Sequence, residues 1–247
     1  MANHVLLDNV THKNLRVRTA LEAGRGFDVN VVRVFPVEFA QLQREYPLFF
    51  FKNAESGHFE TIALLGFSDR ENLYLTGRNW DADYVPLTVQ RQPFLIGFRE
   101  QVVDGVPRQV PVVHVDLDHP SISDTEGEPV FLPHGGESPY LERINSILGA
   151  IRSGHDASRA LSQVLVGLEL IESIAVNVEF DDGSKQGLGG LYTINEDKLR
   201  GLSANGLEVL HGKGHLQDIY MLLASLLNVK PLIEKKNRLL SRRGGTA

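Results

Sequence analysis

Apolar runs separated by turn residues dominate the first half of the chain. Residues 48–51 and 59–65 are mostly apolar and flank the polar stretch 53–57, a pattern typical of a β-hairpin. Further strands are predicted at residues 27–31, 73–75, 94–98 and 110–115. One helix is expected among them, because Pro36 suits a first helical position, the next apolar residues recur at helical spacing, and Pro47 ends the run. The first half is therefore predicted to consist mostly of antiparallel hairpins.

The second half shows helical periodicity with one strand pair inside it. An apolar stripe predicts a helix that Ser138 caps and Gly154 ends, followed by a second helix over residues 157–168. Residues 174–180 alternate between apolar and polar side chains, which predicts a half-buried strand. The dipeptide Asp182–Gly183 supplies a hairpin turn into the return strand.

Helices are expected to fill the rest of the chain. Short helices follow Asn195 and Ser203, and Pro231 opens the final helix. Between them, a stronger helix carries its predicted apolar face on Leu216, Ile219, Tyr220, Leu223 and Leu227. The two halves predict an α+β protein, with a β-rich, aromatic-rich sub-domain over residues 1–136 and a mainly helical sub-domain containing one β-hairpin over residues 137–247. We expect these sub-domains to form one compact unit.

Composition places the chain among ordinary globular proteins. It has 247 residues, of which 42% are hydrophobic and 23% charged, with a formal net charge of −6. These values argue against a disordered chain and against a basic nucleic-acid-binding protein. The absence of cysteine excludes a disulfide scaffold, a thiol catalyst and a cysteine-ligated metal.

No export or membrane signal is evident in the sequence. The most apolar stretch, residues 220–229, is half the length of about 20 residues that a spanning helix needs. The N-terminal residues lack the pattern of a signal peptide. We therefore expect a cytoplasmic protein without a transmembrane segment; the alternative is a cell-surface protein exported by a non-classical route.

Charge is distributed unevenly along the chain. Residues 112–142 contain seven acidic residues and no Lys or Arg, whereas residues 230–243 contain six basic residues and only Glu234 as an acid. We interpret these segments as a solvated acidic loop and a solvated basic helix. The alternative is that the two segments interact, within one chain or between two copies.

The glycine and histidine motifs do not form a recognised catalytic pattern. The spacing of Gly206 and Gly212 does not fit a phosphate-binding loop, and neither GxSxG nor HExxH occurs. The glycines at 187, 189 and 190 fall in a return strand, where they indicate a bulge or a close backbone contact. His211 and His215 have glycines between them, so we expect them in a turn between helices.

His114 and Asp116 are the best candidates for binding a metal ion. Residues two apart on a strand face the same side, so the imidazole and the carboxylate could contact one ion. Such a pair is two thirds of a facial triad for ferrous iron, and His134, His155 or His211 could supply the third ligand. The alternative is an ordinary strand end that leads into an acidic loop.

A second candidate site combines aromatic and charged side chains. It consists of Trp80, Asp81, Asp83, Tyr84 and Arg91. Exposed rings stack on ligands, and the acids would bond to hydroxyl or amine groups. The alternative is that Trp80 and Tyr84 pack in the core with their polar atoms satisfied.

The order of motifs along the chain resembles the bacterial SapC family. The motifs are HKNLRV (12–17), EFAQLQREYPLFF (38–50), ENLYL (71–75), WDADYVP (80–86), QRQPF (90–94), EGEPVF (126–131), SPYLERI (138–144) and GLYTINEDKL (190–199). The resemblance implies an association with a paracrystalline surface layer; some relatives carry a permease label, which the apparent lack of a spanning segment disfavours. Family members neighbour genes for TonB-dependent receptors, flavin-dependent halogenases and cupin-like oxygenase homologues. This implies an accessory role in the uptake or modification of a compound, and it implies no catalytic residues.

Three functions follow as hypotheses. The first is a non-enzymatic soluble binding or accessory protein without a cofactor, whose partner is a small molecule or a modifying enzyme. The second is a surface-layer structural protein that assembles with copies of itself. The third is an iron-dependent, oxygenase-like enzyme that uses His114 and Asp116, with iron or another divalent metal as its cofactor.

Overall fold

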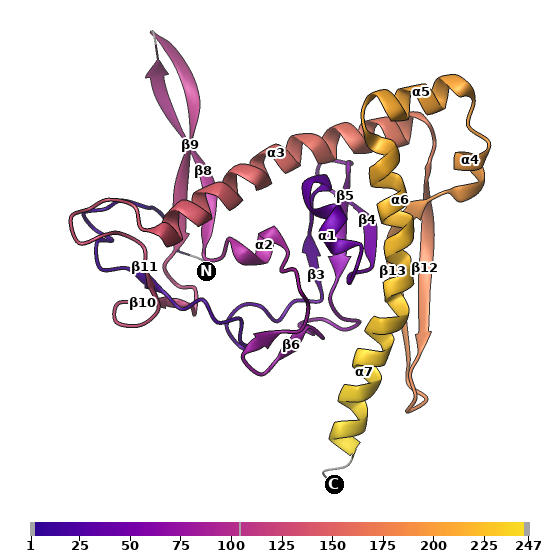
Figure 1. The fold of residues 1–247 in the computed structure, drawn as a ribbon, viewed down its shortest axis with the longest axis horizontal. Coiled ribbons are helices and arrows are strands. Elements are labelled where there is room, and N and C mark those ends of the chain that lie inside the picture. The colour runs from indigo at the N-terminus through magenta and orange to yellow at the C-terminus, as the bar shows by residue number, and fades with distance from the viewer. Residues whose placement is uncertain (1–2, 104, 245–247) are drawn as a thin grey trace. The chain divides into compact units, whose positions relative to one another are not determined.

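The computed structural model describes residues 3–103 and 105–244, apart from the side chains of Val103, Arg243 and Gly244 (Figure 1). It is an α+β fold, as predicted. Contacts divide the chain into two compact units. Unit 1 comprises Met1–Phe27, Leu75–Trp80 and Leu87–Arg152, and unit 2 comprises Asp28–Tyr74, Asp81–Pro86 and Ser153–Ala247. This division differs from a boundary at residue 136, because strands from both halves of the sequence pair within unit 2.

Unit 1 is built from small antiparallel sheets. Their strands are β1 (His4–Leu6), β9 (Val106–Asp116) and β8 (Phe94–Val103) in one sheet, β10 (Ile122–Ser123), β2 (Arg16–Val17) and β11 (Glu128–Pro129) in a second, and β6 (Leu75–Thr76) with β7 (Asn79–Trp80) in a third. A short helix, α2 (Leu87–Gln90), precedes β8. Phe94 and Val115 lie in a core cluster with Ile144 and Leu148 from the first part of helix α3 (Pro139–Gly167).

Unit 2 contains one five-stranded antiparallel sheet. Its order is β12 (Ile171–Glu179), β13 (Lys185–Ile194), β4 (Leu48–Lys52), β5 (Phe59–Leu64) and β3 (Val31–Arg33). Its helices are η1 (Pro36–Glu38), α1 (Phe39–Leu42), α4 (Glu196–Arg200), α5 (Ala204–Gly212), α6 (His215–Ser225), η2 (Leu226–Asn228) and α7 (Val229–Gly244). The second part of α3 also belongs to this unit.

Both predicted hairpins of unit 2 are confirmed. In the β4–β5 turn, the Asn53 side chain accepts hydrogen bonds from the backbone N–H groups of Glu55 and Ser56, which closes the turn. In the β12–β13 turn, Gly183 adopts a positive φ of 80°. The pairing of β12 with β13 shifts register between Ile174 and Val176, which confirms the bulge that the glycines indicated.

Several predicted element ends are wrong by a few residues. The first helix ends at Leu42 instead of reaching Pro47, and β3 begins only at Val31. β6 begins at Leu75, where the predicted strand was to end. The final helix α7 begins at Val229 and continues directly from η2, so Pro231 lies within its first turn and does not open it.

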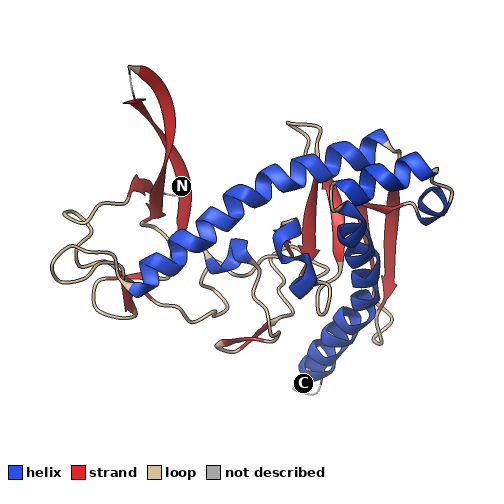
Figure 2. Ribbon diagram, turned by 45° about the horizontal axis from the view of Figure 1, so that its top comes forward, coloured by secondary structure: helices blue, strands red, loops and turns tan. Residues whose placement is uncertain are grey.

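The prediction that Gly154 ends a helix is wrong. Residues 139–167 form one unbroken helix, α3 (Figure 2). A Cβ atom on Gly154 would lie 2.7 Å from Cβ and Cγ of Phe35, whose ring is 1% exposed. The glycine therefore permits close packing against Phe35, a requirement that local sequence does not reveal.

The predicted apolar face of α6 is only partly buried: Leu216 and Leu223 are half-buried, and two of its five residues are exposed. Ile219 is fully buried, but Tyr220 is 60% and Leu227 is 80% exposed. The buried face includes two polar residues, His215 and Ser225. Because Ser225 Oγ accepts a hydrogen bond from Leu48 N–H (3.0 Å) and donates one to the Leu222 carbonyl (2.6 Å), a polar residue occupies a core position that an apolar pattern excludes.

One helical run has membrane-like dimensions. His215–Arg242 spans 28 residues and is long and apolar enough to cross a bilayer, judged by length and composition alone. The apolar stretch read from the sequence covered only residues 220–229 of this run. Ile219, Leu222 and Leu232 on the run are buried, but less than a quarter of its most apolar window is.

Glycine substitutions on α3 test the role of close packing. Gly154→Ala should lower the free energy of unfolding by about 1–3 kcal/mol, because the new methyl group meets a buried ring. The matched change Gly149→Ala should raise it by about 0.5–1 kcal/mol, because nothing lies within 4 Å of that position. Urea unfolding of both variants measures the difference. Equal changes in the free energy of unfolding of the two variants would show that helix propensity alone, and not packing against Phe35, determines the effect of Gly154→Ala.

Candidate functional site

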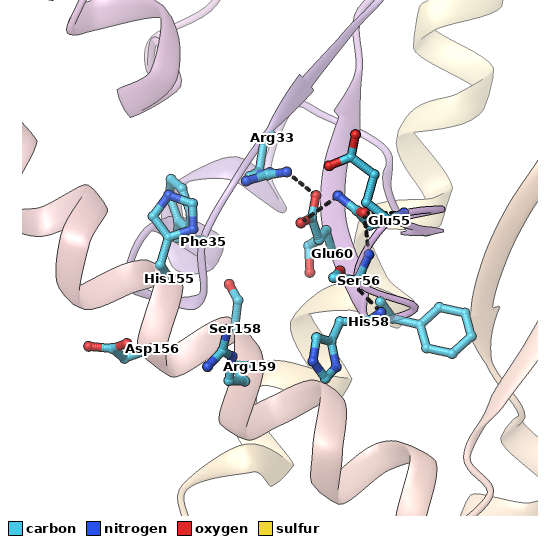
Figure 3. Close-up of a pocket in the computed structure, with 13 residues that line it drawn as sticks. Arg33, Phe35, Glu55, Ser56, His58, Glu60, His155, Asp156, Ser158 and Arg159 are labelled. Carbon is cyan, nitrogen blue, oxygen red and sulfur yellow. Dashed lines mark hydrogen bonds and ion pairs between the residues drawn. The ribbon is translucent and has the colours of Figure 1, made fainter. Parts of the chain in front are cut away.

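A cavity of about 320 Å³ lies within unit 2, between the β4–β5 hairpin and α3 (Figure 3). Phe35 and Phe59 provide its apolar surface. Its polar lining comes from Arg33, Asn53, Glu55, Ser56, His58, Glu60, Thr61, His155, Asp156, Ser158 and Arg159. The volume is at the lower end of the range for small-molecule sites.

An ion pair fixes one wall of the cavity. Arg33 on β3 pairs with the Glu60 carboxylate on β5, and Asn53 Nδ2 donates a hydrogen bond to the same carboxylate (3.2 Å). Because Arg33 lies opposite Ile62, two residues from Glu60 on the neighbouring strand, the ion pair joins diagonal neighbours across the sheet. The charge of Arg33 is therefore largely neutralised within the protein.

Ser158 carries the one buried side-chain polar atom without a hydrogen-bond partner in the described chain. Figure 3 shows its hydroxyl directed away from α3, toward the side of the cavity formed by Arg33 and Glu60. Leaving a buried hydroxyl unpaired costs about 1–3 kcal/mol. Ser162, one helical turn further on, instead accepts a hydrogen bond from Phe59 N–H (3.2 Å). Ser162 therefore helps to hold α3 against β5, whereas Ser158 lines the cavity and its hydroxyl has no partner.

Histidine and arginine side chains complete the cavity. The His155 ring packs edge-on against Phe35, with ring centroids 4.8 Å apart. Arg159 has no ion pair with any residue of the described ranges. Neither imidazole is hydrogen-bonded to the Ser158 hydroxyl, so this structure does not show the contact that activates a serine nucleophile. The arrangement offers hydrogen-bond donors to a ligand.

The predicted aromatic and acidic site is divided between the units. Trp80 and Arg91 belong to unit 1, and Asp81, Asp83 and Tyr84 belong to unit 2. Arg91 Nη1 donates a hydrogen bond to the Phe94 carbonyl (2.5 Å), and burial lowers the pKa of its guanidinium.

The three unit 2 members of that site are engaged in internal contacts. The Asp81 carboxylate pairs with Lys235, and the Asp83 N–H donates to the Glu45 carboxylate (3.0 Å). The Tyr84 hydroxyl donates to the Glu38 carboxylate (3.2 Å). Ligand binding by these residues stays a prediction.

The contact between Tyr84 and Glu38 anchors a buried charge. Glu38 is 2% exposed, and its second carboxylate oxygen accepts a hydrogen bond from Phe35 N–H (3.0 Å). Burial raises the pKa of the Tyr84 hydroxyl well above its usual range, and the neighbouring Glu38 charge raises it further.

His114 and Asp116 lie on the outer face of β9. The alternate residue Val115 is buried, so these two side chains face away from the core. The register of β1 places His4 opposite Asp116, with Nε2 4.0 Å from the carboxylate, and the His114 ring lies beside Gly97. Within residues 3–103 and 105–244, no three His, Asp or Glu side chains are arranged to hold a metal ion. Metal binding by this pair stays a prediction.

The turn predicted between His211 and His215 is confirmed at residues 213–214, but the histidines themselves lie in helices: His211 in the last turn of α5 and His215 at the first position of α6. Gly214, with φ of 78°, separates α5 from α6. His215 is the first residue of α6, and its Nδ1 lies 3.2 Å from the Asp218 carboxylate.

The fold and the cavity define an α+β protein with a small cavity lined mainly by polar residues. Comparison with protein families supplies the closer identification. The SapC family matches residues 7–232, so the chain belongs to the SapC family, as the order of its motifs predicted. No curated protein and no solved structure gives a significant match.

Removing the Tyr84 hydroxyl tests its support of Glu38. Tyr84→Phe should lower the free energy of unfolding by about 1–3 kcal/mol near pH 7, because a buried carboxylate loses a donor. The difference in free energy of unfolding between wild type and Tyr84→Phe should become smaller above about pH 10. In wild type the unfolded tyrosine releases its proton before the folded one, so rising pH favours unfolding.

Urea unfolding at pH 7 and pH 11 measures both effects. Tyr220→Phe is the matched control, because Tyr220 is exposed. A difference between wild type and Tyr84→Phe that stays constant with pH would contradict a raised pKa at Tyr84.

Proposed function

We propose that this SapC-family protein is a non-enzymatic binding protein that holds a small anionic molecule in the cavity between the β4–β5 hairpin and α3. The buried, unpartnered hydroxyl of Ser158 carries this proposal. A protein retains an unpaired buried donor at a cost to its stability, and a bound ligand would supply the missing partner.

The charge of the ligand follows from the donors that line the cavity. Arg159 presents a planar guanidinium whose geometry matches a carboxylate or a phosphate. His58 and Ser158 lie in the same lining and can donate further hydrogen bonds. Glu55 and Asp156 also line the cavity, so they disfavour a ligand with several negative charges.

A binding role fits the chemistry better than a catalytic one. A nucleophilic serine needs a base within hydrogen-bond reach, and Ser158 has no such contact. An accessory role in the uptake or modification of a small acid agrees with what the family resemblance implies. Such a protein would present or sequester the compound while a partner acts on it.

Serine removal gives a test that needs no ligand. Ser158→Ala should raise the free energy of unfolding by about 1 kcal/mol, because it deletes an unpaired buried hydroxyl. Ser162→Ala is the matched control and should lower it by about 1 kcal/mol, because Phe59 N–H loses its acceptor. Urea unfolding measures both. A Ser158→Ala variant less stable than wild type would contradict a hydroxyl kept for binding.

Direct binding is tested with small carboxylates and their neutral amides. Acetate, succinate, benzoate and citrate are titrated against the isotope-labelled protein by NMR, beside acetamide, succinamide and benzamide. At least one mono- or dicarboxylate should bind saturably and at least tenfold more tightly than its amide, with shifts centred on residues 53–61 and 155–159. Arg159→Gln should weaken this binding about tenfold, and Arg152→Gln, an exposed arginine on the same helix, should not. Equal affinity for acid and amide, or no saturable binding, would contradict the proposal.

A further inference from the structure

An apolar row lies exposed along the helical run that begins with α6. We define the row as Leu216, Tyr220, Leu223 and Leu227, spaced four, three and four residues apart. Tyr220 is 60% and Leu227 is 80% exposed, and Leu216 and Leu223 are half-buried. Leu216, Tyr220 and Leu223 each follow a buried residue by one position, which rotates them about 100° from the packed face of the helix. Figures 1 and 2 show α6, η2 and α7 as one continuous run beside the sheet of unit 2.

Basic residues bracket the row at both ends. Lys213 precedes α6, and Lys230 follows Leu227 by three residues; both are exposed. Arg238 continues the same face, accompanied by the single acid Glu234. None of these three cations has an ion pair with another described residue. The face is therefore apolar at its centre and positive at its ends.

This charge pattern disfavours a second copy as the occupant. In an antiparallel pair centred on the row, Leu216 lies opposite Leu227 of the other copy, which places Lys213 opposite Lys230. In a parallel pair, each lysine lies opposite its own counterpart. Both arrangements bring like charges together. The row also extends over only about 16 Å of helix, which is short for a stable dimer interface.

We propose that the row docks on the surface of a bilayer that contains anionic lipids. Leucine side chains would enter the boundary between headgroups and acyl chains, and Tyr220 would lie at headgroup level, where aromatic rings with a polar atom are favoured. The lysine ammonium groups would extend to lipid phosphates. The packed residues of the run remain in the core of unit 2, so the helix lies on the membrane and does not cross it. This inference is independent of the cavity.

Vesicle binding tests the proposal with the full chain. Protein is sedimented with vesicles of phosphatidylcholine alone and of phosphatidylcholine with 30% phosphatidylglycerol, at 0.1 M and 0.5 M NaCl. The partition coefficient should be at least fivefold higher on the anionic vesicles and should fall at least threefold at the higher salt concentration. Alkaline carbonate should release the bound protein, because the proposed contact uses one face of a helix whose other face stays packed on the sheet.

Two pairs of variants separate the apolar and the charged contributions. Tyr220→Ser with Leu227→Ser should lower partitioning at least tenfold, and Val166→Ser, an exposed apolar residue on α3, should not. Lys213→Gln with Lys230→Gln should lower it about fivefold. Lys185→Gln with Lys198→Gln removes the same charge from other exposed positions of unit 2 and should have a smaller effect.

Four results would overturn the proposal. They are equal binding to neutral and anionic vesicles, resistance to carbonate extraction, row variants that bind like wild type, and a sedimentation velocity that shows a dimer lost in the row variants. The last result would assign the row to a second copy. A fifth result, capture of a synthetic acidic amphipathic peptide without vesicle binding, would also overturn the proposal and would assign the row to an acidic helix.

Discussion

Two residue pairs join the five-stranded sheet on which unit 2 depends. Leu191 lies opposite Phe51, and Tyr192 lies opposite Phe50, linking a hairpin from the first quarter of the chain to one more than 100 residues later. Each hairpin alone would be marginal in water. Once joined, they form a surface on which α6 packs, and Ser225 completes the contact by accepting a hydrogen bond from Leu48 N–H. Both the cavity and the exposed helix face follow from this junction.

Two close contacts hold α3 on either side of the cavity, one with Phe35 before η1 and one with β5. At Gly154 the missing side chain lets the helix contact Phe35, and at Ser162 a hydroxyl accepts a hydrogen bond from Phe59 N–H. Ser158 lies between these contacts, one turn before Ser162. The helix is therefore held at both sides of Ser158.

The sequence predicted what local rules determine. The turns at residues 53–57 and 182–183, the caps at Ser138, Asn195 and Ser203, and the strand alternation are all confirmed. The predictions were wrong where a residue far away in the sequence determines the local structure. Phe35 explains why Gly154 does not end α3, and the backbone of Leu48 explains why Ser225 is buried. The cavity residues were missed for the same reason, because Ser158 and His58 become neighbours only through tertiary packing. The spacing of His155, Ser158 and Arg159 on one helix was the available signal, and His155 was considered only as a metal ligand.

The basic helix shows why the apolar row cannot be hidden by a rotation of α6 and α7. We expected its charges to be solvated, but Lys235 pairs with Asp81 and Lys236 pairs with Glu71, and the last two side chains are only 12% and 14% exposed. These ion pairs fix the angle of α7, and the Ser225 hydrogen bond fixes that of α6. Turning the run to bury Tyr220 and Leu227 would break the ion pairs of Lys235 and Lys236 and the hydrogen bond between Ser225 and Leu48. The exposed row is thus a fixed consequence of how the helix is anchored.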